Sequence, residues 1–284
     1  MLEGSVEANG LKFAYLEEGS GPLVLLLHGF PDNAITWQRV IPALAEHKYR
    51  AVAPYMRGYA PTTAPQDGRY DPAALADDVA GLIDALNDGE PAFVVGHDWG
   101  ASATYAAMAL HPRKIRRAVT IALGPPGSWV RILERPELLR HAFHFWLFQI
   151  PGIAESAVSA NNFALIEYLW KLWSPGHQDP EHIKRVKETL AWPNAVEQAL
   201  GYYRAVLQFP VTHPEIARRM QAEPLTVPTL LVVGGNDRGH EMSEGQERHF
   251  AGEYRREVVP GAGHFVQREQ AEVLTRLIVD WLKE

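Results

Sequence analysis

Residues 94–101 have the sequence VVGHDWGA, which places an aspartate where many enzymes hold a serine nucleophile. Residues 96–100 fill the frame G-x-S-x-G, in which a strand turns sharply into a helix. An aspartate has an unperturbed pKa of about 3.9, so it is already ionised near neutral pH and needs no base before it attacks. A carboxylate can displace a leaving group from saturated carbon and form an alkyl ester. The pattern therefore predicts Asp98 as a nucleophile, with capping of the following helix as the alternative.

Three further groups follow predicted strands, as Asp98 does. They are the segment HGFPD at residues 28–32, Asp237 in GGND, and His264 in PGAGHF. Open parallel sheets bind ligands beyond the carboxyl ends of their strands, so these groups are expected to share one edge of a sheet. Each alone could be a turn former or a loop histidine. Together, in the order nucleophile, acid, histidine, they predict a single catalytic site.

The motifs HGFPD, MRGY, VVGHDWGA, GGND and GAGHF resemble those of the α/β-hydrolase superfamily, and within it the epoxide hydrolases and their dehalogenase relatives. The resemblance runs from about residue 10 to the end, although only short patches match in the middle of the chain. It implies an α/β-hydrolase fold, with a mostly parallel eight-stranded sheet flanked by helices and an inserted helical cap. The implied core is residues 1–124 and 223–284, and the implied cap is residues 125–222.

The resemblance also implies roles for individual residues. Asp98 would form the alkyl ester, and His264, oriented by Asp237, would activate the water that hydrolyses this ester. The backbone N–H groups of Phe30 and Trp99 would hold the oxyanion. The side chains that the resemblance implies as substrate contacts are Phe30, Pro31, Trp99, Trp146 and Phe265.

An epoxide and an alkyl halide make different demands on such a site. A halide leaves as a stable anion, whereas an epoxide oxygen leaves as an alkoxide and needs a proton donor. Many haloalkane dehalogenases have asparagine at the position of Phe30, and fluoroacetate-type dehalogenases have arginine at that of Trp99. The resemblance therefore favours an epoxide hydrolase that makes vicinal diols, with a haloalkane or haloacid dehalogenase as the alternative. A non-catalytic protein that binds apolar ligands is a third possibility, which the complete triad opposes.

Epoxide hydrolases use two cap tyrosines as donors, and this chain offers a tyrosine and a histidine. Tyr203 stands directly before an arginine, as its family counterpart does, and a capping box of Asn194 and Glu197 is expected to begin its helix. The segment FHFWLFQIPG at residues 143–152 places His144 where tyrosine is usual. Its imidazole N–H can donate, but its charge is expected to change near neutral pH. The alternative for Tyr203 is a structural tyrosine of the hydrophobic core, and the alternative for His144 is a structural histidine packed among aromatic residues.

The elements that must position these groups alternate between strand and helix. Strands are predicted at residues 12–16, 22–28, 50–53, 92–96, 115–121, 229–235 and 255–259. Helices are predicted at residues 37–47, 72–86, 101–110 and 270–283, the second with Asp71 as its N-cap and Pro72 at its first position. Residues 5–8 show no clear pattern. The alternation indicates a parallel sheet with helices on both faces, interrupted by a long helical stretch rich in tryptophan.

The amino-acid composition limits the kinds of molecule that the protein is expected to bind. A net charge of −7 without a basic run argues against nucleic acid as a partner. The chain has no cysteine, no apolar run long enough to span a membrane, and no signal-peptide pattern at its start, so a cytoplasmic protein is expected. No metal-ligand spacing such as H-E-x-x-H is present, and neither a metal nor a cofactor is expected. The expected partners are a small apolar epoxide or alkyl halide and water, bound by a monomer or homodimer.

Overall fold

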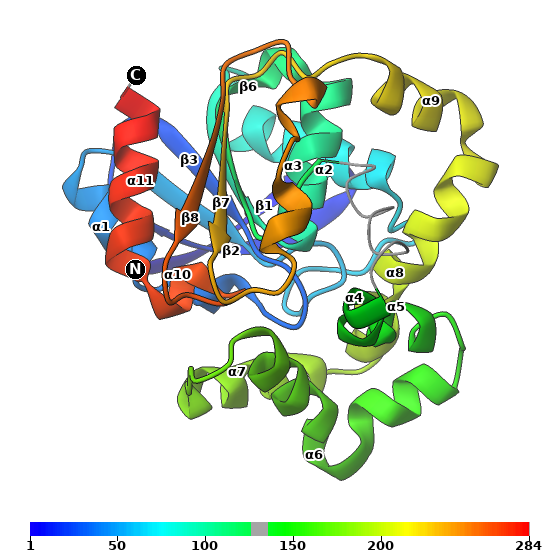
Figure 1. The fold of residues 1–284 in the computed structure, drawn as a ribbon. Coiled ribbons are helices and arrows are strands. Elements are labelled where there is room, and N and C mark those ends of the chain that lie inside the picture. Colours follow the sequence, from blue (N-terminus) through cyan, green and yellow to red (C-terminus); the bar gives the residue numbers. More distant parts are fainter. Residues whose placement is uncertain (126–135, 284) are drawn as a thin grey trace.

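A computed structural model describes residues 1–125 and 136–283, which form an eight-stranded sheet with helices on both faces (Figure 1). The order of strands across the sheet is β1-β2-β4-β3-β5-β6-β7-β8. β1 pairs antiparallel with β2, and β2 with β4, whereas all later pairs are parallel. The predicted mostly parallel sheet of eight strands is confirmed. The strands are β1 (Leu2–Ala8), β2 (Leu11–Glu18), β3 (Leu23–Leu27), β4 (Arg50–Pro54), β5 (Ala92–His97), β6 (Ile115–Ile121), β7 (Thr229–Gly234) and β8 (Tyr254–Val259).

The helices divide into two layers against the sheet and a group between β6 and β7 (Figure 1). The layer helices are α1 (Val40–Glu46), α2 (Pro72–Leu86), α3 (Trp99–Leu110), α10 (Val266–Glu269) and α11 (Ala271–Lys283). The helices between β6 and β7 are α4 (Pro136–His141), α5 (Phe143–Leu147), α6 (Ile153–Trp173), α7 (Pro180–Leu190), α8 (Ala195–Thr212) and α9 (Pro214–Ala222). No helix in residues 1–125 and 136–283 is both long and apolar enough to cross a membrane.

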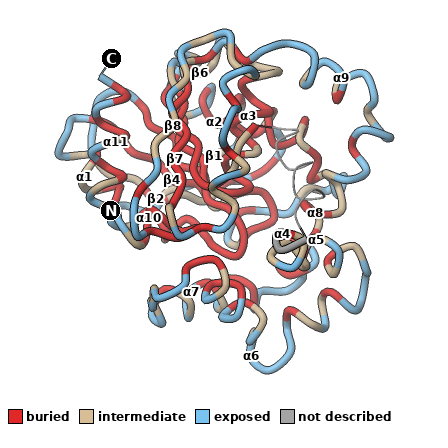
Figure 2. The backbone as a smooth tube through the Cα atoms, viewed as in Figure 1, coloured by how far each residue is buried: buried red, intermediate tan, exposed pale blue. Residues whose placement is uncertain are grey.

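The sheet has an apolar cluster on each face. Successive strand residues point to opposite faces. In β3, Val24 and Leu26 therefore pack in the cluster with α1 and α11, whereas Leu25 and Leu27 pack in the cluster with α2 and α3. All five residues of β3 are buried, and Figure 2 shows the middle of the sheet buried throughout. Burial on both faces explains why this strand is an unbroken apolar run in the sequence.

Two predicted helix beginnings have different outcomes. The Asp71 cap is confirmed, because its side chain accepts hydrogen bonds from the backbone N–H groups of Ala73 and Ala74, both at 3.1 Å. The capping box at α8 is wrong. Asn194 precedes α8 but has φ 61° and ψ 3°, and its side chain makes no capping hydrogen bond. A capping side chain needs an extended backbone at its own residue, and asparagine adopts the left-handed conformation instead.

The helix predicted at residues 37–47 begins three residues later in the structure, at Val40, and ends at Glu46. A 3-10 turn at Ala34–Trp37 precedes α1, and the side chain of Asn33 begins that turn by accepting a hydrogen bond from the Ile35 N–H at 2.9 Å. This capped turn ends the loop that follows β3, so the loop carrying the HGFPD motif is held at both ends by regular structure.

Candidate active site

Asp98 lies at the turn between β5 and α3, with φ 52° and ψ −115°. A non-glycine residue in such a sparsely populated conformation costs about 1–3 kcal/mol and persists where its surroundings fix it. The backbone N–H of Asp98 donates to the Ile121 carbonyl at 3.2 Å, and its carbonyl accepts from the Ser102 N–H at 3.0 Å. Its side chain makes no capping hydrogen bond to α3, which contradicts the alternative of a simple helix cap. One carboxylate oxygen, Oδ1, instead accepts from the Phe30 N–H at 2.8 Å.

Glycine is required at two places around this turn. A β-carbon on Gly100 would lie 2.3 Å from the Leu27 carbonyl oxygen, and one on Gly29 would lie 2.4 Å from the Asp98 side chain. Both distances are far shorter than any contact between such atoms. The glycines therefore allow β3, α3 and the loop after β3 to approach closely enough for the Phe30 N–H to reach Asp98.

The structure brings the three predicted triad residues together. The imidazole of His264 lies between two carboxylates, with Nδ1 2.9 Å from Asp237 Oδ2 and Nε2 3.6 Å from Asp98 Oδ2. The three side chains are buried, with 9–12% of their surface exposed. Because a carboxylate only accepts, Nδ1–H donates to Asp237, and this bond aims Nε2 at Asp98.

The protonation states of these three groups depend on one another. Burial lowers the pKa of His264, but hydrogen bonds and charges from Asp237 and Asp98 outweigh burial and raise it to about 10. Burial acts to raise the pKa of each carboxyl, and His264 brings both below their usual value. The free site therefore holds an imidazolium between two carboxylates. Loss of the charge on Asp98 would remove one of the two carboxylates that raise the pKa of His264, so this pKa would fall.

Two other histidines shape the loops around the site. His28 donates from Nδ1 to the Gly29 carbonyl at 3.0 Å, and its Nε2 accepts from the Met56 N–H at 3.0 Å. His97 lies 3.1 Å through Nε2 from the carbonyl of His264. Burial lowers the pKa of both histidines to about 4, with the charge of His264 adding to the effect on His97. Both rings therefore remain neutral at physiological pH and act as supports.

The two predicted donors lie side by side. Tyr203 on α8 is only 1% exposed, and its ring packs edge to face on Trp99 at 4.9 Å and on Phe30 at 5.5 Å between ring centroids. His144 on α5 packs edge to face on Tyr203 at 5.5 Å. The charge of Asp98 acts on both groups. Asp98, Tyr203 and His144 therefore share one aromatic enclosure.

Burial keeps a proton on each donor at neutral pH. Burial, followed by the charge of Asp98, raises the pKa of the Tyr203 hydroxyl well above 10. Burial lowers the pKa of His144 to about 3, so its imidazole is neutral and carries one N–H. The expected change in the charge of His144 near neutral pH is therefore wrong, because the sequence does not show how completely that ring is removed from water.

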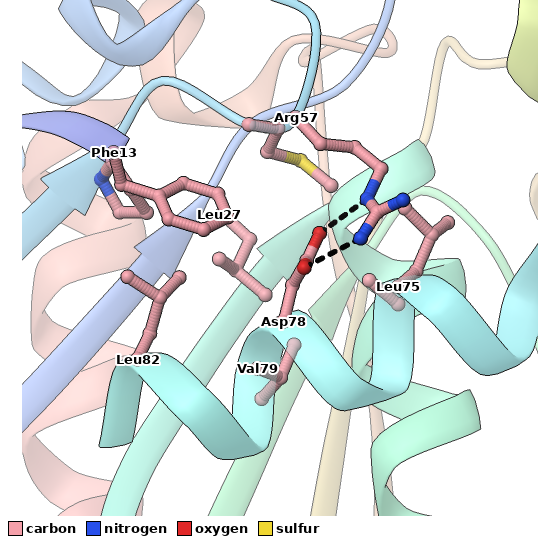
Figure 3. Close-up of a pocket in the computed structure, with 10 residues that line it drawn as sticks. Phe13, Leu27, Arg57, Leu75, Asp78, Val79 and Leu82 are labelled. Carbon is pink, nitrogen blue, oxygen red and sulfur yellow. Dashed lines mark hydrogen bonds and ion pairs between the residues drawn. The ribbon is translucent and has the colours of Figure 1, made fainter. Parts of the chain in front are cut away.

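Hydrogen bonds hold α8 at Tyr202 and at Tyr203. The hydroxyl of the preceding residue, Tyr202, donates to the Arg57 carbonyl at 2.8 Å. Arg57 forms a buried ion pair with Asp78 on α2, at 2.5 and 2.7 Å, in the close-up of Figure 3. On the other side, the Gln149 amide donates to the Tyr203 carbonyl at 3.0 Å. The segments MRGY (residues 56–59) and FQIPG (residues 148–152) thus both make hydrogen bonds to α8. Sequence reasoning missed that these two segments contact the same helix.

One predicted substrate contact lies at the surface in this structure. Trp146 is 55% exposed, and the neighbouring Phe145 instead packs on Tyr203 at 5.0 Å. Phe148, which sequence reasoning also missed, packs on Tyr203 at 4.9 Å. Helical spacing contains the signal: residues i and i+4 share a face, so His144 and Phe148 point inward together, while i+2 points away.

Pro31 and Phe265, two of the predicted substrate contacts, both contact Trp170 on α6. The indole N–H of Trp170 donates to the Pro31 carbonyl at 2.9 Å, and its ring stacks on Phe265 with centroids 3.5 Å apart. Phe265 also packs on His264 at 5.1 Å. Trp170 therefore joins the loop after β3 to the loop that carries the histidine, and both loops lie against α6.

The fold and the site define a class of protein. Residues 22–271 match the family model for the alpha/beta hydrolase fold, and the chain belongs to that family and is a hydrolase. It is 28% identical to epoxide hydrolase 4 of Homo sapiens over 292 residues, which cover 98% of this chain and 78% of that protein. It is also 28% identical to epoxide hydrolase A of Mycobacterium tuberculosis over 316 residues, covering 99% and 97%. The crystal structure of epoxide hydrolase VrEH1 from Vigna radiata superposes with a TM-score of 0.83 at 27% identity, covering 99% and 97%.

Proposed function

We propose that the protein is an epoxide hydrolase, which opens an epoxide to a vicinal diol through an ester on Asp98. The observation that carries the proposal is the pair of buried donors, Tyr203 and His144, which hold their protons beside this nucleophile. A departing halide needs no proton, whereas a departing epoxide oxygen does. The similarity to proteins named epoxide hydrolases supports the same choice.

In the first step, a carboxylate oxygen of Asp98 attacks an epoxide carbon, and the ring C–O bond breaks. The ring oxygen keeps the electron pair and takes a proton from Tyr203, while His144 donates a hydrogen bond to it. Ester formation removes the charge of Asp98, so the imidazolium of His264 releases its proton, which returns to Tyr203 through water. The step thus leaves a neutral imidazole beside the ester.

In the second step, Nε2 of His264 takes a proton from water, and the resulting hydroxide attacks the ester carbon of Asp98. The N–H groups of Phe30 and Trp99 stabilise the oxyanion that forms. When this intermediate collapses, the diol oxygen departs and takes the remaining carboxyl proton. The cycle returns an ionised Asp98 and a protonated His264, so one water is consumed for each epoxide.

In this proposal, residues 125–222 are a cap, and residues 1–124 with 223–284 are the core. The core supplies the triad from the ends of β5, β7 and β8, and the cap supplies His144 from α5 and Tyr203 from α8. The aromatic residues of the enclosure suit a small apolar epoxide. Water is the second substrate.

The test uses the two steps separately. His264→Gln should open the epoxide but fail to hydrolyse the ester, so mass spectrometry should find the mass of a styrene-like epoxide added to the peptide that holds Asp98. In ¹⁸O-labelled water, a single turnover of the wild type should label the carboxyl group of Asp98 and leave the diol unlabelled. His47→Gln, at an exposed histidine, is the control. If ¹⁸O appears in the diol and not in the carboxyl group of Asp98, the mechanism is wrong. Halide release from haloalkanes, without diol formation from epoxides, would indicate a dehalogenase.

A further inference from the structure

The loop that carries the Phe30 N–H is held by the helices between β6 and β7. Each of the three residues after Phe30 makes a hydrogen bond to α6 or α7. The bonds join the Pro31 carbonyl to Trp170 Nε1 at 2.9 Å, Asp32 Oδ1 to His182 Nε2 at 2.7 Å, and Asn33 Nδ2 to Thr189 Oγ1 at 3.0 Å. The position of the oxyanion donor is therefore tied to the placement of these two helices.

The pair of Asp32 and His182 is the most deeply buried of these links. The side chains are 0% and 1% exposed, although they lie 150 residues apart in the chain. Burial acts to raise the pKa of Asp32, and the charge and hydrogen bond of His182 outweigh this and lower it, so the carboxyl is ionised. A buried pair of this kind contributes little net stability, because desolvation offsets the attraction. In addition, Nδ1 of His182 has no hydrogen-bond partner among the described residues.

We propose that Asp32 and His182 are positioning residues, which hold the Phe30 N–H at the oxygen of Asp98 and complete the oxyanion site when α7 is seated on the core. This inference rests on the proposed function. The Phe30 N–H lies 2.8 Å from Asp98 Oδ1, and Asp32 is two residues away in the same loop. Neither Asp32 nor His182 needs to touch the substrate, since they act through the backbone of the loop.

If Asp32 and His182 position the Phe30 N–H, substitutions at these residues should change the rate of ester hydrolysis more than the rate of ester formation. An oxyanion donor matters most when the tetrahedral intermediate forms, which is the hydrolysis step. Loss of one such donor costs about 10²–10³ in rate, and a donor that is displaced by about 1 Å should cost about 10- to 100-fold. His182→Phe and Asp32→Asn should therefore slow hydrolysis by this factor. The alkyl-enzyme should accumulate, and kcat and KM should fall together while kcat/KM changes little.

The experiment measures kcat, KM and the steady-state fraction of alkyl-enzyme for both single variants and the double variant. Because the two residues act as one unit, the double variant should be no slower than His182→Phe alone. Lys187→Gln is the matched control, since Lys187 lies on the same helix but pairs with Glu167 at the surface, and it should behave as wild type.

Several results would overturn the inference. A fall in kcat at unchanged KM, with no additional alkyl-enzyme, would mean that the pair only maintains the fold. Effects that multiply in the double variant would mean that the residues act separately. If His182→Phe does not fold, Trp170→Phe is the substitute, because it removes one hydrogen bond to the loop and retains an aromatic ring. The alkyl-enzyme must then accumulate in Trp170→Phe as well. The adduct on His264→Gln tests the proposed function separately, because that variant leaves Asp32 and His182 intact.

Discussion

The charge of Asp98 should control the protonation of His264, and Asp98→Asn tests this dependence directly. The substitution removes one charge and keeps the shape of the side chain. In the structure, Asp98 Oδ2 lies 3.6 Å from His264 Nε2. At that distance and an effective dielectric constant of about 20, the attraction between unit charges is about 4.6 kcal/mol. This energy corresponds to a change of about 3 in pKa. The pKa of His264 should therefore fall from about 10 to about 7 in the variant.

The assay is an NMR titration of the His264 ring in wild type and Asp98→Asn. The wild-type ring should remain protonated through pH 8, and the variant ring should titrate near neutral pH. Asp84→Asn removes a half-exposed carboxylate that pairs with Lys114, and it should leave the titration of His264 unchanged. The variant mimics the charge of the proposed ester intermediate, so the same measurement shows whether a neutral base is available for the proposed second step.

Two results would refute this reasoning. If the wild-type ring of His264 is neutral at pH 7, the two carboxylates do not outweigh burial, and the ordering of proton transfers in the proposed mechanism is wrong. If Asp98→Asn changes the pKa by less than 1, solvent or a rearrangement screens the charge of Asp98, and ester formation cannot switch His264 from acid to base. In the second case, Asp237 alone would set the pKa.

Tyr203→Phe should slow epoxide opening by about 10²-fold or more, because His144 alone must then stabilise the departing oxygen, and single-turnover kinetics should show slow ester formation. The turnover of an alkyl halide, if present, should change far less, and an equal loss on both substrates would mean that Tyr203 acts only by packing. Stability should fall steeply in acid, because folding keeps three buried histidines neutral that the unfolded chain protonates below about pH 6.5; they are His28, His97 and His144. Their pKa values of about 4, 4 and 3 predict that the free energy of unfolding decreases by about 3–4 kcal/mol for each unit by which the pH is lowered near pH 5. Urea unfolding at pH 5 and 6 measures this slope, and a flat profile would show that these rings take up protons in the folded state.

Most of the fold could be predicted because its signals are local. A strand buried on both faces is an unbroken apolar run, as in β3. The bounds predicted for β6 are those of the structure. The Asp71-Pro72 pair marks the beginning of α2 directly. β1 escaped prediction because it is an edge strand with mixed exposure and no apolar run. Its one strong signal was the turn Asn9-Gly10, where both residues have positive φ, as a two-residue hairpin requires.

The site was only partly predictable, because some of its properties arise from contacts between distant segments. Asp98, Asp237 and His264 each follow a strand, so the topology of the sheet brings them together. The environment of His144 is different, since the depth of its burial decides its charge and no local pattern shows that depth. Spacing from His144 indicates that Phe148 shares its face and that Trp146 does not. Spacing does not show that Phe145 lies inward, which depends on how α5 is rotated against α8.

Burial has opposite effects on the groups of this site, and the arrangement of charges decides which effect prevails. Removal from water keeps Tyr203 protonated and His144 neutral, and both conditions favour donation to a departing oxygen. The same removal acts to raise the pKa of Asp98, whereas the imidazolium of His264 at 3.6 Å and the Phe30 N–H act to lower it. A cation beside an aspartate in an apolar enclosure therefore favours the ionised form of the carboxyl group. In the proposed mechanism, this cation is the imidazolium of His264 in the free enzyme. The same histidine becomes a base after Asp98 has reacted, because the charge of Asp98 changes between the two steps.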